Sequence, residues 1–291
     1  MPATLLPDSH FARSVPPQAW FAVSAVFHYL GPSFAVLLFP AVGIVGVAWM
    51  RIAFAALVFA PFTRPWRTLA RMDGSARILL LALGACLAVM NTVFYLALDR
   101  LPMSLVAAME FVGTIGVALY GLRTGRNLTA LALSVAGVAL LIDVRWSSDA
   151  LGLVLAAVNA ACFVGYIILA HRVARTKAGG GGIAGLGAAM AIAFLFILPF
   201  GASQALAAFV SPVLVLAGLG VAVCSSVIPY VCDQLAMARL PRSSFALMLA
   251  LLPATATIVG VIVLGQIPGL GDIAGVALVM AGVAIHKPAA K

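Results

Sequence analysis

Long apolar stretches follow one another along almost the whole chain, separated only by short polar connections. Hydrophobic residues make up 64% of the 291 residues, and charged residues make up 9%. Soluble domains do not carry this balance, so lipid must form part of the solvent. Lipid admits only helices or closed barrels, because every backbone polar group there needs an internal partner. The stretches lack the period-two alternation of a barrel strand, which predicts an all-α membrane protein.

Ten stretches have about the length, roughly 20 residues, with which a helix crosses the hydrocarbon core. We predict transmembrane helices over residues 18–38, 44–62, 77–98, 102–120, 127–143, 150–171, 183–200, 212–237, 242–264 and 270–286. An even number of spans places both termini on one side of the membrane. The first span is too long for a signal peptide, so we expect residues 1–17 and 287–291 to be tails of the mature chain.

Positive charge is distributed unequally between the two sides of this topology. Fourteen of the seventeen Lys and Arg residues fall at span ends on one side: Arg13, Arg64, Arg67, Arg71, Arg77, Arg123, Arg126, Arg172, Arg175, Lys177, Arg239, Arg242, Lys287 and Lys291. Arg100 and Arg145 lie opposite, and Arg51 lies inside a span. Since positive charge resists translocation, the rich side and both termini are predicted to be cytoplasmic. Scattered charges of this kind favour membrane lipids, and not nucleic acid, as neighbours.

The two halves of the chain resemble each other. Arg100-Leu101-Pro102 precedes the fourth predicted span, and Arg239-Leu240-Pro241 precedes the ninth. Ala136-Gly137-Val138-Ala139 in the fifth span recurs as Ala281-Gly282-Val283-Ala284 in the tenth. Two such matches, in order and at nearly the same spacing, indicate an internal repeat.

Each half contains five spans, an odd number, so the second half must run upside down relative to the first. We predict two inverted five-helix repeats, residues 18–143 and 150–286, with a central cavity. This architecture is typical of secondary transporters, which open such a cavity to each side of the membrane in turn.

Two charged residues, Arg51 and Glu110, lie inside predicted spans at similar depth below the outer surface. A charge there costs about 2.5–3.5 kcal/mol or more on insertion scales, so each needs a partner or water. One interpretation is an ion pair that locks the second and fourth spans together. In a second, Glu110 is a proton site or meets a substrate ammonium, while Arg51 tunes the pKa of Glu110 or faces a carboxylate. In a third, the two side chains reach separately toward the membrane surface.

Further polar side chains lie near the middle of the predicted membrane. The candidates for substrate binding or proton coupling are His28, Tyr29, Asn91, Tyr95, Asn159, Tyr166, Ser226 and Tyr230. Ordinary interhelical hydrogen bonding is the alternative for each of them. Asp233 is close to the cytoplasmic end of its span, and we expect it to be an interfacial charge.

Prolines interrupt three of the predicted spans. Pro32, Pro229 and Pro253 each remove a helix hydrogen bond and permit a bend. They are candidates for hinges, with static kinks as the alternative.

The sequence offers little for metal or cofactor chemistry. All four cysteines lie in apolar spans and no Cys-x-x-Cys is present, so we expect no metal and no cofactor. An intramembrane enzyme is an alternative from another class, but no serine–histidine motif and no His-Glu-x-x-His supports it. The expected partners are a small-molecule substrate and lipid, and the expected assembly is a monomer.

The chain resembles the drug/metabolite transporter superfamily in its ten-helix form with two EamA repeats, and within it the threonine/homoserine and aromatic amino-acid exporters. The resemblance rests on Phe39-Pro40, Gly43, Gly46, Arg51, Pro65-Trp66-Arg67, Asn91, Tyr95, Leu101-Pro102, Ala107, Glu110-Phe111, Pro229-Tyr230, Arg239-Leu240-Pro241, Pro253-Ala254 and Leu264-Gly265. It implies an inner-membrane exporter of amino acids or similar small zwitterions. A broad exporter of cationic drugs is the alternative within the superfamily.

Two positions depart from the pattern of that superfamily. Leu252 and Gln266 stand where its members often carry glutamate. The second half is therefore expected to lack a buried acid, and the resemblance leaves Glu110 as the principal candidate for coupling.

Overall fold

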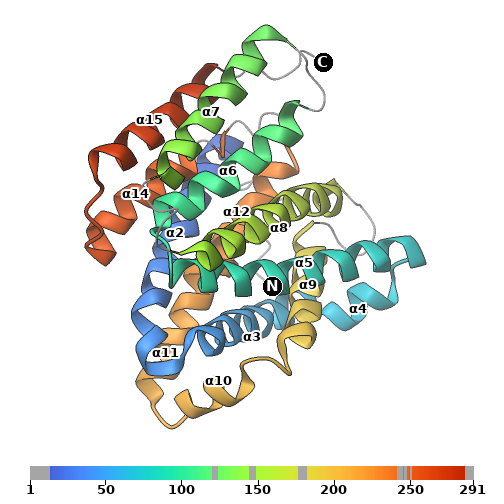
Figure 1. Ribbon diagram of the computed structural model, residues 1–291. Helices are drawn as coiled ribbons and strands as arrows, with labels where there is room; N and C mark the ends of the chain where they lie inside the picture. Colours follow the sequence, from blue (N-terminus) through green and yellow to red (C-terminus); the bar gives the residue numbers. More distant parts are fainter. Residues whose placement is uncertain are drawn as a thin grey trace. The chain divides into compact units, whose positions relative to one another are not determined.

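The described part of the chain is helical throughout, as predicted (Figure 1). The computed structural model describes residues 14–119, 124–143, 149–175, 182–240, 245, 248–249 and 251–285. Its helices are α2 (Pro17–Val42), α3 (Ile44–Thr63), α4 (Pro65–Ala70), α5 (Gly74–Leu98), α6 (Met103–Leu119), α7 (Gly125–Asp143), α8 (Ala150–Arg175), α9 (Gly182–Ile197), α10 (Ala202–Ala208), α11 (Pro212–Ala222), the π-helix η3 (Val223–Val227), α12 (Ile228–Met237), α14 (Leu251–Leu264) and α15 (Leu270–Ile285).

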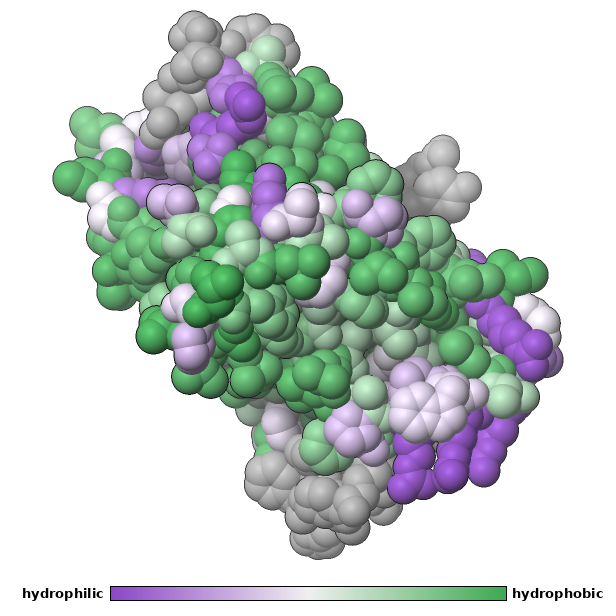
Figure 2. All heavy atoms as spheres, turned by 90° about the horizontal axis from the view of Figure 1, so that it is seen from below, coloured by the Kyte–Doolittle hydropathy of each residue, from purple (hydrophilic) through white to green (hydrophobic). Residues whose placement is uncertain are grey.

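Several of these helices are suited to a membrane. Five are long and apolar enough to cross it, and a sixth span is made if the bent pair α9 and α10 counts as one. Three shorter apolar segments lie in α6, α14 and α15. Large apolar side chains are exposed on many helices, such as Leu57 at 64% and Ile78 at 68%. Apolar residues dominate the surface in Figure 2, with hydrophilic ones gathered in patches, as expected of a protein in lipid.

The described contacts divide the chain into two compact units. Unit 1 comprises Met1–Thr92 and Gly165–Leu240, and unit 2 comprises Val93–Val164 and Pro241–Lys291. Each unit takes helices from both predicted repeats, so a unit is not a repeat. The repeat boundaries at 18–143 and 150–286 stay a prediction.

In unit 1, close approach between helices depends on glycine. A Cβ on Gly187 of α9 would lie 2.2 Å from Thr63 Oγ1 of α3, and one on Gly31 of α2 would lie 2.4 Å from Ser225 Oγ of η3. Gly43 separates α2 from α3 with a φ of +82°, a backbone conformation that glycine adopts without steric cost. These contacts hold α2, α3, α9 and η3 near enough for short polar side chains to meet.

Two short helices of unit 1 were not predicted. α4 follows α3 directly, and α10 follows α9 after a bend of 103°. The predicted span 183–200 therefore ends earlier, at Ile197. Gln204 of α10 accepts a hydrogen bond from the N–H of Gly46 (2.9 Å), which attaches α10 to the start of α3. Apolar composition alone did not reveal this bend, because α10 is itself apolar.

In unit 2, α7 and α15 lie side by side (Figure 1) and pack with reciprocal contacts. A Cβ on Gly137 would meet Gly275 and Val279, and one on Gly282 would meet Ala130 and Ser134. Each glycine thus meets the residues three and seven positions before the other glycine. Residues nearer the start of α7 contact residues nearer the end of α15, so the two helices are antiparallel. The two repeated Ala-Gly-Val-Ala segments therefore lie on a helix pair whose contacts are related by a local two-fold axis.

Candidate functional site

Arg51 is the centre of a buried polar cluster in unit 1. Its side chain lies on α3 and is 3% exposed. Arg51 Nε donates to Ser226 Oγ (2.9 Å), and Nη2 donates to the carbonyl of Ser225 (2.8 Å). Pro229, four residues after Ser225, has no N–H to donate to this carbonyl. The hydrogen bond from Arg51 ties the guanidinium to the irregular segment η3.

Tyr230 extends this cluster toward α5. Its hydroxyl lies 3.5 Å from Arg51 Nη2 and donates to Asn91 Oδ1 (3.1 Å). Asn91 in turn donates to the carbonyl of Leu87 (2.7 Å). The ring of Tyr166 packs on the ring of Tyr230, with centroids 5.4 Å apart. The structure thus brings together five predicted residues: Arg51, Ser226, Tyr230, Asn91 and Tyr166.

Asp233 belongs to the interior of unit 1, and the prediction of an interfacial charge was wrong. Its side chain is 5% exposed. Oδ1 accepts a hydrogen bond from Ser24 Oγ (2.6 Å), and Oδ2 accepts one from Tyr166 OH (2.9 Å). The expectation that the second half lacks a buried acid was wrong for the same reason.

A signal for Asp233 was present in the sequence. Ser226, Tyr230 and Asp233 are spaced by four and three residues, which places them on one face of a helix. The position of Asp233 near the end of its span suggests an interfacial charge. Its spacing from Ser226 and Tyr230 instead puts the carboxylate on the helix face that carries these predicted site residues. The structure follows the helical phase.

His28 and Tyr29 are both buried on α2 in unit 1. Their rings meet edge to face, with centroids 5.3 Å apart. His28 is within electrostatic reach of Arg51, and it lies one helical turn after Ser24. These contacts place His28 beside the cluster.

Unit 2 holds a second buried polar contact. Asn159 Nδ2 of α8 donates to Glu110 Oε1 of α6 (2.7 Å), and both side chains are buried. Tyr95, also in unit 2, is fully buried with its ring tilted against Phe94. Asn159 therefore makes an interhelical hydrogen bond. The pairing of Arg51 with Glu110 stays a prediction.

The three candidate hinge prolines have different local settings. Pro32 lies inside α2, which continues unbroken to Val42. Pro229 is the second residue of α12, the helix that follows the π-helix η3 directly. Pro253 lies in the first turn of α14, because that helix begins at Leu251. Since π-turns inside helices are frequent at functional sites, Pro229 has the most distinctive setting, and all three hinge roles stay predictions.

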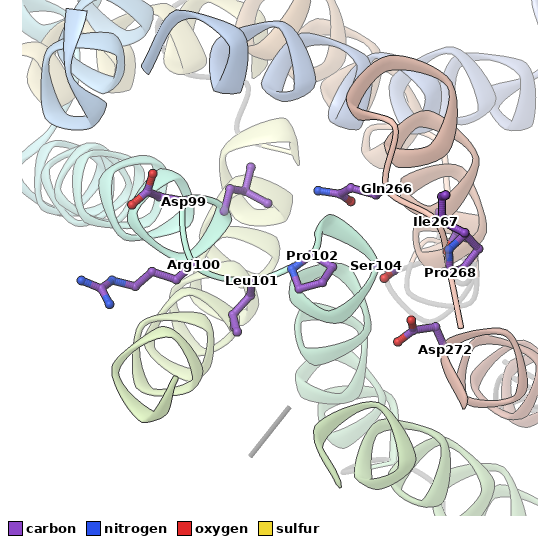
Figure 3. A pocket seen from close by; sticks show the side chains of 11 residues that line it. Asp99, Arg100, Leu101, Pro102, Ser104, Gln266, Ile267, Pro268 and Asp272 are labelled. Carbon is purple, nitrogen blue, oxygen red and sulfur yellow. The ribbon is translucent and has the colours of Figure 1, made fainter. Parts of the chain in front are cut away.

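A hollow of about 330 Å³ lies in unit 2 between the α5–α6 and α14–α15 connections (Figure 3). Its lining comprises Leu98, Asp99, Arg100, Leu101, Pro102, Ser104, Thr257, Gln266, Ile267, Pro268 and Asp272. Gln266 Oε1 accepts from the N–H of Met103 (3.3 Å), so this departure from the superfamily pattern joins the two connections. Arg100 forms a partly exposed salt bridge with Asp149 (3.0 Å), and such pairs contribute little to stability.

Known proteins similar to this chain are membrane transporters. Residues 150–286 match the EamA-like transporter family. The chain is 34% identical over 239 residues to the threonine/homoserine exporter RhtA of Escherichia coli (strain K12), covering 81% of this chain and 79% of the exporter. The same exporter of Salmonella typhimurium (strain SL1344) matches with the same identity and coverage. One protein crystal structure shares the fold, with a TM-score of 0.59, 17% identity, and coverage of 92% of this chain and 96% of that chain.

The apolar helices describe a multi-pass membrane protein, and the similarity to known exporters assigns it to the class of membrane transporters. More particularly, the chain belongs to the EamA-like transporter family, within the drug/metabolite transporter superfamily.

Proposed function

We propose that the chain exports amino acids or similar small zwitterionic metabolites across the bacterial inner membrane by alternating access. The observation that carries the substrate class is the 34% identity to threonine/homoserine exporters over 81% of the chain. Threonine and homoserine are therefore the substrates to test first. No catalytic activity is part of the proposal.

The predicted topology is part of this proposal. It has ten spans, two inverted five-helix repeats, a central cavity and cytoplasmic termini. The antiparallel α7–α15 pair supports the inversion, because the fifth and tenth spans run in opposite directions in that topology. The excess of Lys and Arg on one side supports the orientation.

Arg51 is the proposed receptor for the substrate carboxylate. A guanidinium is planar and offers two parallel N–H donors, a geometry that matches a carboxylate. Ser226 and the Ser225 carbonyl hold Arg51 in position through two hydrogen bonds. A receptor held in this way loses little conformational freedom when the substrate binds.

Glu110 is proposed to serve the transport cycle in unit 2, either as a proton site or as the partner of an ammonium. Asn159 orients its carboxylate through the 2.7 Å hydrogen bond. An ionisable residue inside a membrane span is by default a functional candidate.

The test is transport by purified protein in lipid vesicles. Labelled threonine is expected to enter saturably with an imposed pH difference, and Glu110→Gln is expected to weaken this movement. Asp99→Asn is the matched control, since Asp99 is an exposed acid of the same unit. Wild-type rates from Glu110→Gln would remove Glu110 from the mechanism.

Two rival functions are separated by the same preparation. If Glu110→Gln abolished only the efflux of cationic drugs, the protein would be a broad exporter of cations. Product formation in detergent, without vesicles or a gradient, would identify an intramembrane enzyme.

A further inference from the structure

We propose that Asp233 is a proton-binding carboxylate of this transporter, and that Ser24 is the hydroxyl whose hydrogen bond changes when the proton binds. This inference rests on the proposed function and adds a coupling group to it. The similarity to known exporters does not assign a role to either residue.

The surroundings of Asp233 set it apart from a structural ion pair. Among the described residues, hydroxyl groups from two other helices supply both side-chain hydrogen bonds to the carboxylate: Ser24 from α2 and Tyr166 from α8. No salt bridge to Asp233 occurs in that part of the chain. An arginine or lysine partner can only donate, whereas a hydroxyl can donate or accept. The two contacts therefore fit both the carboxylate and the carboxylic acid.

Ser24 has a choice of two acceptors for its single hydrogen. Its Oγ lies 2.6 Å from Asp233 Oδ1 and 3.2 Å from the carbonyl oxygen of Pro229. With Asp233 ionised, Ser24 donates to Oδ1. When a proton from water binds Oδ1, the acid donates to Ser24 Oγ and the serine hydrogen turns to Pro229 O. The proton later returns to water on the other side of the membrane, and nothing is oxidised or reduced.

This exchange of hydrogen bonds occurs at the irregular part of the helix that contacts Arg51. Pro229 follows η3, whose Ser225 carbonyl and Ser226 hydroxyl accept from Arg51. A second connection runs through the rings, because Tyr166 donates to Asp233 and packs on Tyr230. The proton on Asp233 and the position of the guanidinium thus depend on one shared segment, which is a physical route for coupling.

Other ionisable groups face this site and must be distinguished from Asp233. Cys232 and Tyr230 lie on α12 itself. Tyr166 comes from α8, with Cys86 of α5 against the neighbouring Gly165. His28 comes from α2, and Arg51 from α3. α9, which also packs on α12, carries no ionisable side chain. His28 is the group most easily mistaken for Asp233 in a pH profile, so His28→Gln is measured beside Asp233→Asn; loss of the gradient response in His28→Gln alone would assign the proton to His28 and overturn the proposal.

The experiment compares two transport modes of the full chain in vesicles: accumulation of labelled threonine driven by a pH difference, and exchange of threonine at equal pH. Asp233→Asn keeps the shape of the acid and fixes it without charge. We expect it to retain exchange and to lose gradient-driven accumulation. Ser24→Ala is expected to shift the pH dependence of accumulation. Asp99→Asn, which neutralises an exposed acid, is expected to leave the response to the gradient in place.

Accumulation by Asp233→Asn that follows the pH difference as in the wild type would overturn the proposal. If Asp233→Asn cannot be purified folded, Ser24→Ala decides, and an unchanged pH dependence refutes the switch. A wild-type protein that exchanges no amino acid would refute the proposed function separately. Asp233 is then tested by proton binding to the substrate-free protein, which must be smaller in Asp233→Asn than in the wild type.

Discussion

Replacement of Arg51 by lysine tests the proposed carboxylate receptor most directly. Arg51→Lys keeps the positive charge and removes the planar guanidinium. In the structure two nitrogens of that group, Nε and Nη2, bond to Ser226 Oγ and to the Ser225 carbonyl at 2.9 and 2.8 Å. One ammonium nitrogen cannot occupy both positions, so lysine loses either the anchoring hydrogen bonds or the pair of donors that we propose for the substrate carboxylate.

The magnitude follows from the hydrogen bond that lysine cannot make. A hydrogen bond to a charged group contributes about 1.5–3 kcal/mol. If one such bond to the substrate carboxylate is absent, the half-saturation concentration should rise about 10- to 150-fold, since about 1.4 kcal/mol corresponds to a factor of ten. Removal of an anchoring bond instead would lower thermal stability and leave affinity closer to the wild type.

The assay is threonine exchange in vesicles over a range of substrate concentrations, with thermal unfolding in detergent measured in parallel. Ser226→Ala is the matched control. It removes one anchor and leaves the guanidinium on the Ser225 carbonyl, so its effect on affinity should be the smaller one. An unchanged half-saturation concentration together with unchanged thermal stability in Arg51→Lys would refute the reasoning, as would a larger loss of affinity in Ser226→Ala.

Three further predictions concern packing, topology and pH. Gly137→Ala places a Cβ 2.6 Å from the Gly275 carbonyl and should cost about 1–3 kcal/mol of stability by overpacking. Gly220→Ala, which meets nothing within 4 Å, should cost none, as measured by thermal unfolding. In a cysteine-free background, a cysteine at Ser75 should react with an impermeant maleimide only from the cytoplasm, and one at Ile267 only from outside; the reverse would contradict the orientation. The N–H of Ala76 and the hydroxyl of Ser75 donate to Asp73 and lower the pKa of its carboxyl below 3.8. The ionised carboxylate therefore stabilises the folded protein above pH 3.8, and this contribution is lost as the pH falls through the lowered pKa. The stability difference between wild type and Asp73→Ala should therefore shrink in acid, and a constant difference would argue against a stabilising role for these hydrogen bonds.

The helices were predictable because apolar length is a local property. Every predicted span overlaps a described helix, and α3, at Ile44–Thr63, matches its predicted range of 44–62 to within one residue. A continuous apolar run in lipid has few alternatives to a helix. The short helix α10 was missed, because its place depends on a hydrogen bond between Gln204 and Gly46, which are distant in sequence.

Most residues of the candidate site could be predicted from the sequence, whereas the contacts between them could not. Arg51, Tyr230 and Asn91 could be chosen from depth alone, since any polar side chain inside a span is conspicuous. Asp233 was misplaced because depth near the end of a span suggests water. Its burial depends on Ser24 and Tyr166, residues 209 and 67 positions away in the chain.

By itself, the sequence determined a helical membrane chain and the places where its helices form, because composition and hydropathy act over one helix at a time. Only the tertiary structure decided which acid meets which hydroxyl, and that the Ser225 carbonyl accepts from Arg51. A hydrogen bond needs two groups within about 3 Å of each other. The distance between two groups that are far apart in the sequence cannot be read from either segment alone.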